Sequence, residues 1–244
     1  MGLMGLMGSQ ARAQFGAYGV KGSVGMATIA DDLSTNSPIV GAGVGGYVNY
    51  TFAESQSVLA EIFYLQSGLN INRRGHNFEA VLDRDNHLSI RQGFYHAYYA
   101  QIPILACVHM ELPIRKAGHV VGVYAGPAVS IGLFGRCRDR MVTPGVSSYK
   151  VNYDVDMHGS SADRAVFNHL QRLDVSAIVG LSYEYRNFVF SLYVDHGFLA
   201  TSKEEDILRV IENNLSGTNN ITTKIPNGNN NAVMVSVGYN LGSF

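Results

Sequence analysis

Apolar residues alternate with small or polar residues along most of this chain, with a period of two. From residue 188 to Val194, for example, every second side chain is Phe, Leu or Val, and the positions between include Ser191 and Tyr193. A period of two indicates β-strands with two different faces. The alternation predicts eight strands, at Phe15–Ala27, Ile39–Phe52, Ser57–Leu69, His96–Leu112, His119–Leu133, Leu173–Tyr185, Phe188–Phe198 and Asn231–Gly242.

Membrane helices do not explain the apolar stretches. Two long segments without charge are Leu33–Ala53 and His119–Gly135, which come near the roughly 20 residues that a spanning helix needs. The first contains several Ser, Thr and Asn residues, and the second contains four glycines and a proline. Glycine and proline are unfavourable in a helix interior, so strands remain the better interpretation.

The polar faces of these strands indicate which side is buried. They contain mainly Gly, Ser, Tyr and Asn, and the eight segments hold six charged residues, one of them Lys. A water-exposed surface would carry about 25–35% charged residues. A transmembrane barrel instead turns its apolar faces to lipid and fills a narrow lumen with small and polar side chains. The rival is a soluble lipocalin-like barrel, in which the apolar faces would surround a hydrophobic ligand.

The connections between the predicted strands alternate in length. Long links cover residues 28–38, 70–95, 134–172 and 199–230, whereas the links between them are short turns such as Arg186–Asn187. Outer-membrane barrels have long extracellular loops and short periplasmic turns, so both termini are expected on the periplasmic side. The spacing of apolar residues predicts one short helix at Lys203–Leu215, and the Asn-rich segment Asn227–Asn231 predicts a turn.

Composition narrows the function classes. The chain has 244 residues, 15% of them charged, and a net charge of -1 with a pI near 6.7. Disordered chains combine low hydrophobicity with high net charge, and nucleic-acid binding needs a basic face, so both are excluded. The two cysteines, Cys107 and Cys137, form neither a disulfide scaffold nor a CxxC zinc motif.

The N-terminal segment ends in the small-x-small pattern Ala11-Arg12-Ala13, after which secretory signals are cleaved. It lacks a basic region, and its apolar stretch is short. We interpret residues 1–13 as the remnant of a signal peptide and residues 14–244 as a single barrel domain. A plain N-terminal tail is the alternative.

Several segments together resemble a known family. They are FGAYGVKGSVGMATI at the first strand, AEIFYLQSG (residues 60–68), YAQIPIL (99–105), VYAGP (123–127) and the closing VSVGYNLGSF. In order and spacing the chain is similar to the PorT-like outer-membrane β-barrels of the Bacteroidetes. The resemblance implies a membrane barrel and a C-terminal Phe244 that the barrel assembly machinery recognises. One member of that family takes part in secretion, a role that motifs of this structural kind do not carry over.

The polar residues on the predicted lumen faces are candidates for an internal network. Lys21 and Glu61 lie at similar heights above the periplasmic ends of their strands and are predicted to pair, because an unpaired charge is costly in a narrow interior. The network can act as a structural plug or as an ion or proton pathway, and a filled eight-stranded lumen favours the plug. Its predicted members are Lys21, Glu61, Tyr99, Gln101, Tyr124, Asp174, Glu184, Tyr193 and Asp195.

Two further chemistries, lipid modification and phosphate binding, have candidate residues in the sequence. An outer-membrane lipid hydrolase or acyltransferase would need a Ser/His/acid cluster at one rim, but Asp195 and His196 point to opposite faces of one strand. We predict no catalytic residue, cofactor or metal ion. The arginines Arg136, Arg138 and Arg140 are expected to contact phosphates of lipopolysaccharide, since arginine binds phosphate well.

The sequence thus predicts an all-β, eight-stranded, antiparallel up-and-down transmembrane barrel in the bacterial outer membrane. It is expected to be a monomer with a narrow polar-filled lumen and no enzymatic activity. It would act through extracellular loops or as a partner in an envelope or secretion complex. Its other expected partners are outer-membrane lipid, lipopolysaccharide and the assembly machinery, and nucleic acid is not among them.

Overall fold

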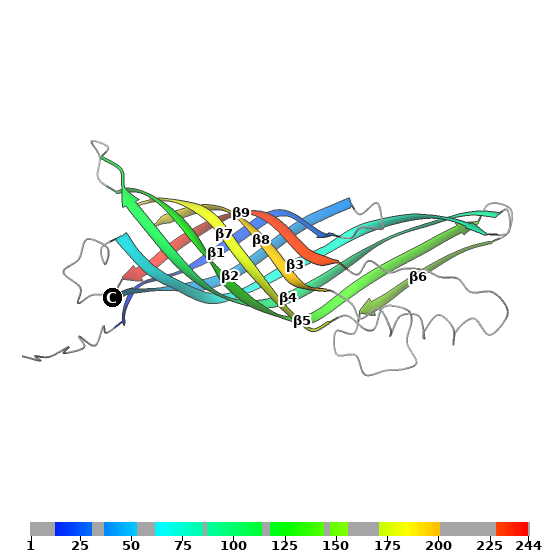
Figure 1. Cartoon of the computed structure of the whole chain (residues 1–244), viewed down its shortest axis with the longest axis horizontal. Coiled ribbons are helices and arrows are strands. Elements are labelled where there is room, and N and C mark those ends of the chain that lie inside the picture. Colours follow the sequence, from blue (N-terminus) through cyan, green and yellow to red (C-terminus); the bar gives the residue numbers. More distant parts are fainter. Residues whose placement is uncertain are drawn as a thin grey trace, which may run out of the picture.

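The computed structural model of the chain describes residues 13–30, 37–52, 62–84, 87–113, 118–143, 147–155, 171–200 and 228–243. In this part of the chain no helix is long and apolar enough to cross a membrane. The strands, shown in Figure 1, are β1 (Ala13–Ala30), β2 (Ser37–Phe52), β3 (Phe63–Arg84), β4 (His87–Glu111), β5 (His119–Thr143), β6 (Ser147–Val155), β7 (Leu173–Tyr185), β8 (Phe188–Ala200) and β9 (Asn229–Ser243).

Eight of these strands close into an antiparallel barrel. They follow one another around the sheet in the order β4-β3-β2-β1-β9-β8-β7-β5, and the pairing of β4 with β5 closes the ring. Every pairing is antiparallel, and β6 pairs with β5 outside the ring. The predicted fold class, an all-β barrel of eight antiparallel strands, is confirmed.

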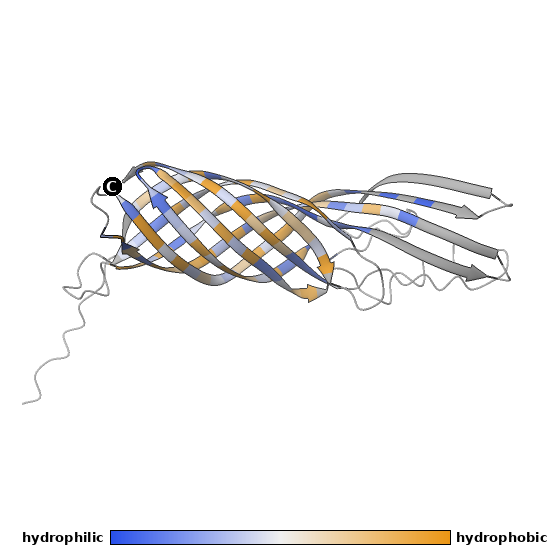
Figure 2. Cartoon of the chain, turned by 90° about the horizontal axis from the view of Figure 1, so that it is seen from above, coloured by the Kyte–Doolittle hydropathy of each residue, from blue (hydrophilic) through white to orange (hydrophobic). Residues whose placement is uncertain are grey.

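The apolar faces point outward. Val24, Val44, Val179 and Val235 each leave more than half of their surface exposed, and Figure 2 shows alternating apolar residues over the barrel wall. A soluble barrel would bury these side chains at a gain of about 25 cal/mol per Å² of apolar surface. The lipocalin-like alternative is therefore wrong, and the outer wall has the composition of a lipid-facing surface.

The two ends of the barrel differ. At one end β7 and β8 are joined by the tight turn Arg186–Asn187, and Ala13 pairs with Phe52 while Ala17 pairs with Ser243, so both ends of the described chain lie there. At the other end β3, β4 and β5 continue past the ring and are joined by β6 (Figure 1). We call residues 78–84, 87–93, 135–143 and 147–155 the projecting sheet.

The projecting sheet is the main departure from the predicted elements. β7 has the predicted bounds, but β3 begins at Phe63 instead of Ser57 and ends at Arg84 instead of Leu69, and β6 was not predicted. Link 70–95 and the described part of link 134–172 are therefore largely hairpin, and Asn229 and Asn230 belong to β9 instead of a turn. Beyond the lipid both faces of a strand can be polar, so the alternation that revealed the other strands is absent. The predicted helix Lys203–Leu215 lies outside the described residues.

A compact apolar cluster occupies part of the lumen. Cys107 is buried there and is packed with Leu105, Ala128, Ile178 and the Tyr64 ring. The lumen is therefore less polar than the sequence predicted, because side chains that fill a narrow barrel gain from close packing as in any protein core. No water-filled channel is needed to explain this part of the interior.

A thiol-labelling experiment tests this packing. In a Cys137→Ser background we expect Cys107 to react with a maleimide at least about a hundredfold more slowly in the folded barrel than after heat unfolding, because labelling must wait for the barrel to open. The control is Asn187→Cys in a chain lacking both native cysteines, since Asn187 lies exposed in the β7–β8 turn. Equal labelling rates at the two positions would show that water reaches the middle of the lumen.

Candidate functional site at the outer mouth of the lumen

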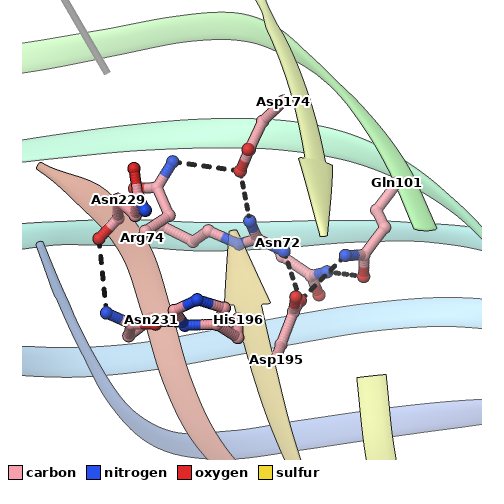
Figure 3. A network of polar contacts seen from close by, with 9 residues as sticks. Asn72, Arg74, Gln101, Asp174, Asp195, His196, Asn229 and Asn231 are labelled. Atoms are coloured by element: carbon pink, nitrogen blue, oxygen red, sulfur yellow. Dashed lines mark hydrogen bonds and ion pairs between the residues drawn. The ribbon is translucent and has the colours of Figure 1, made fainter. Parts of the chain in front are cut away.

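Arg74 of β3 occupies the lumen at the end from which the projecting sheet rises. Its guanidinium donates from Nη1 to Asp174 Oδ2 on β7 at 3.0 Å and from Nη2 to Asp195 Oδ2 on β8. All three side chains are at most 4% exposed. Figure 3 shows the arginine extended between the two carboxylates.

The positions of the strands explain why this contact matters. β3 and β8 lie four strands apart around the ring of eight, which places them on opposite walls, and β7 is the neighbour of β8. Arg74 therefore spans the lumen and ties the two walls together. Gly75 follows it with φ +149°, a conformation that side chains rarely adopt, and a Cβ there would overlap the Tyr95 carbonyl oxygen.

Polar side chains from other strands extend the contact into a network. Asn72 donates to Gln101 Oε1 at 2.7 Å, and Gln101 Nε2 donates to Asp195 Oδ2 at 2.8 Å. On the other side, Asn230 Nδ2 donates to Asp174 Oδ2 at 3.1 Å. These residues come from β3, β4, β8, β9 and β7, so the network joins most of the wall (Figure 3).

The network contains more negative than positive charge, and this charge is buried. One arginine faces two aspartates, and Oδ1 of both carboxylates is buried without a hydrogen-bond partner among the described residues. The Tyr99 ring adds a cation–π contact, with the Arg74 guanidinium carbon 5.6 Å from its centroid. Removing one member of a buried charged set leaves the others uncompensated. The arrangement therefore closes the mouth of the lumen and depends on the arginine.

A family model for the "Outer membrane protein beta-barrel domain" matches residues 9–202. The chain belongs to this family. Together with the lipid-facing wall, membership places the protein in the bacterial outer membrane, as the sequence predicted. A comparison with curated proteins found no match.

Solved structures of small outer-membrane barrels are similar over most of the chain. Neisserial surface protein A is 10% identical with a TM-score of 0.37, covering 93% of this chain and 98% of that one. Ail from Yersinia pestis, solved in complex with the heparin analogue sucrose octasulfate, is 11% identical with a TM-score of 0.34 and coverages of 93% and 100%. The N-terminal barrel of Pseudomonas aeruginosa OprF is 12% identical, with a TM-score of 0.32 and the same coverages. No residue role is carried over from them.

Within this outer-membrane barrel, the residues predicted for the lumen network fall into two groups. Tyr99, Gln101, Asp174 and Asp195 are buried and surround Arg74. The others lie elsewhere in the lumen: Tyr124 and Tyr193 pack against the apolar cluster, Lys21 and Glu184 are partly buried, and Glu61 lies outside the described residues.

The predicted Lys21–Glu61 pair thus stays a prediction. Among the described residues, the salt bridges are those between Arg74 and the two aspartates, and neither Lys21 nor Glu184 forms one. The lysine faces the glycines Gly45 and Gly238 on its two neighbouring strands. In the described chain, Lys21 and Glu184 therefore stay outside the charged group of Arg74, Asp174 and Asp195.

Arg74, the centre of the network, was missed. The sequence interpretation ended the third strand at Leu69 and assigned Arg74 to a loop. The inward positions Asn70, Asn72, Arg74 and His76 do continue the period of two, and this continuation was the available signal. The outward positions between them become polar at Arg73, so the alternation of hydrophobicity no longer marks the strand.

Three of the described histidines are hydrogen-bonded to side chains other than a serine or a carboxylate. The described hydrogen-bond partners of His96, His119 and His196 are Arg73, Tyr183 and Asn231, respectively. These contacts supply no serine nucleophile beside a histidine and an acid. In the same part of the chain, no cluster of three or more His, Cys, Asp or Glu side chains is placed to hold a metal ion. Phe244 lies outside the described residues.

Proposed function

We propose that this outer-membrane barrel is a non-enzymatic surface protein that recognises partners through its projecting sheet. The observation that carries the proposal is the length of β3, β4 and β5, which have 22, 25 and 25 residues against 13 in β7 and β8. At about 3.3 Å per residue, the additional residues of these strands extend roughly 20–30 Å beyond the ring. A chain that only had to span the membrane would not need them.

The projecting sheet has two edges that lack a neighbouring strand in the described chain. β2 pairs with β3 only as far as Asn77, so residues 78–84 have β4 on one side alone. β6 pairs with β5 on one side alone. Such an edge presents unpaired backbone N–H and C=O groups to an added strand. The proposed partner is therefore an extended segment of another surface or envelope protein.

The side chains inside the lumen also support the proposal that the projecting sheet is the functional part of the protein. Arg74 and its partners lie buried at the mouth, and the apolar cluster around Leu105 and Cys107 occupies part of the lumen below them. We propose that the lumen is a structural core and not a pathway for ions or protons, and that the protein works as a monomer. We also propose that the chain belongs to the PorT-like branch of the family. The PorT-like motifs of the sequence support this assignment.

Peptides selected against the wild type, and then compared for binding to a shortened variant, test the proposal. The variant joins Glu79 to Gln92, and Arg138 to Asn152, which are register partners, through Asn-Gly turns that suit two-residue hairpins. Random peptides displayed on phage are selected against the folded wild-type barrel in nanodiscs. We expect the selected peptides to bind the shortened barrel at least about tenfold more weakly, and to lose binding when alternate backbone amides are N-methylated, because strand addition uses main-chain hydrogen bonds.

Two results with the same preparations would contradict the proposal. Peptides that bind both proteins equally would remove the projecting sheet from the binding surface. Release of fatty acid or transfer of an acyl chain, when the wild-type barrel is incubated with phospholipid or lipid A, would show an enzyme. Heat-dependent gel mobility of the shortened variant establishes that its barrel is folded before either result is interpreted.

A further inference from the structure

An aromatic pair marks the outer edge of the lipid-facing wall on β4 and β5. Tyr98 and Phe134 are register partners, and their rings stack with centroids 4.7 Å apart. Phe134 is 57% exposed, and Ile131 below it is 42% exposed. Aromatic rings of this kind sit at the level of the lipid headgroups, with apolar side chains on the membrane side.

Basic residues lie level with that pair and above it on the same outward face. Arg73 of β3 is the register partner of Tyr98, and its Nη2 donates to the ring of His96 at 3.0 Å. His96 is in turn the register partner of Arg136. One rung farther, the Arg138 guanidinium carbon lies 5.1 Å from the centroid of the Phe94 ring. The exposed arginines Arg136 and Arg138 of β5 thus lie on the same outward face as Arg73 of β3, with β4 between the two strands.

The register places more basic than acidic residues along these rungs. Arginine only donates hydrogen bonds, so the His96 nitrogen that meets Arg73 accepts and carries no proton. Across the β5–β6 ladder the partner of Arg136 is Asp154, and that of Arg138 is Asn152. Three arginines therefore meet one acid along these rungs.

We propose that Arg73, Arg136 and Arg138 form a binding site for the phosphate groups of the glycolipid in the outer leaflet, the lipid A part of lipopolysaccharide. Its acyl chains would lie on the apolar wall below the aromatic pair. Its phosphates would meet Arg73 at the level of the pair, and Arg136 and Arg138 one and two rungs above it. Guanidinium groups match phosphate oxygens in a bidentate geometry. Successive outward rungs are about 7 Å apart, so the phosphates contact more than one arginine.

The site differs from the one that the sequence predicted. Arg73 joins it from β3, whereas Arg140 pairs with Gln92 and Lys150 one rung farther from the aromatic pair and is assigned outside the site. On the opposite wall, the described outward residues at this end include Phe198 and His196, whose rings meet edge-on at 5.3 Å. The glycolipid site is therefore on one side of the barrel. Arg136 and Arg138 belong to the base of the projecting sheet, and the proposal does not depend on partner binding at the two edges of that sheet, residues 78–84 and β6.

Native mass spectrometry of the folded barrel with diphosphorylated lipid A tests the site. We compare the wild type with the triple variant Arg73→Gln/Arg136→Gln/Arg138→Gln and with Arg186→Gln. Arg186 is an exposed arginine at the opposite end of the barrel, in the β7–β8 turn. Because one hydrogen bond to a charged group contributes roughly a factor of ten or more, we expect the triple variant to bind at least about tenfold more weakly, and Arg186→Gln to bind like the wild type.

Further probes distinguish the source of the phosphate. Dephosphorylated lipid A is expected to bind the wild type as weakly as diphosphorylated lipid A binds the triple variant, and inorganic phosphate is not expected to displace lipid A. Equal binding of the two lipid forms, or equal binding by the triple variant and Arg186→Gln, would overturn the proposal. Displacement by inorganic phosphate would replace it with a site for free anions. Heat-dependent gel mobility confirms folding, and in the wild type alone added salt should weaken the complex.

Discussion

Replacing Arg74 with Leu is expected to destabilise the barrel by about 3–5 kcal/mol, which makes it one of the two most damaging single substitutions considered. The arginine binds Asp174 and Asp195, and all three side chains are buried. Without it, two carboxylates remain in the lumen with amide donors alone, from Gln101 and Asn230. The free energy of unfolding can be measured by urea titration in detergent, with gel mobility reporting the folded fraction.

Two further variants separate charge from packing. Arg140→Leu removes an exposed arginine outside the lumen and should change the unfolding free energy by less than about 0.5 kcal/mol. Arg74→Leu/Asp174→Asn/Asp195→Asn removes the whole charged set and should recover most of the lost stability, because a neutral replacement of a buried ion group is often tolerated. If Arg74→Leu unfolds at the same urea concentration as the wild type, the carboxylates are hydrated and the mouth of the lumen is open.

The contact of Arg74 with the two aspartates separates what the sequence could predict from what it could not. Alternation predicted the lipid-facing wall correctly, and β7 has its predicted bounds, because lipid imposes an apolar face on every spanning strand. Asp174 and Asp195 were assigned to the lumen by the same period. Their common partner was not found, because a contact across the lumen depends on the relative heights of strands that are not neighbours. Local pattern contains no information on those heights.

The projecting sheet was missed for a related reason. Outside the membrane neither face of a strand must be apolar, so β6 and the outer parts of β3, β4 and β5 carry no alternation to detect. The arginines near the rim illustrate the consequence. Arg136 and Arg138 were expected to meet phosphate, but Arg73 was separated from them by more than 60 residues of sequence, and only the register of β3, β4 and β5 brings it beside them.

Replacing Gly180 with Val is expected to be the second severe change. Gly180 faces the lumen on β7, and a Cβ there would lie 2.5 Å from Cζ of Tyr124 and 2.8 Å from the backbone oxygen of Leu192. The ring cannot move far, because Tyr124 packs against the apolar cluster around Leu105 and Ile178. Overpacking of a filled core costs about 1–3 kcal/mol and sometimes more. We expect a loss of about 3 kcal/mol in the urea titration.

Gly22→Val is the matched control, since Gly22 lies exposed on the outward face of β1 with nothing within 4 Å of its Cβ position. Valine favours strands over glycine, so this variant should fold at least as stably as the wild type. Adding Tyr124→Ala to Gly180→Val should restore part of the lost stability, because it relieves the contact with the ring but not that with Leu192. A tolerated Gly180→Val together with a damaging Gly22→Val would mean that the strand faces are reversed, with the lumen where the lipid has been placed.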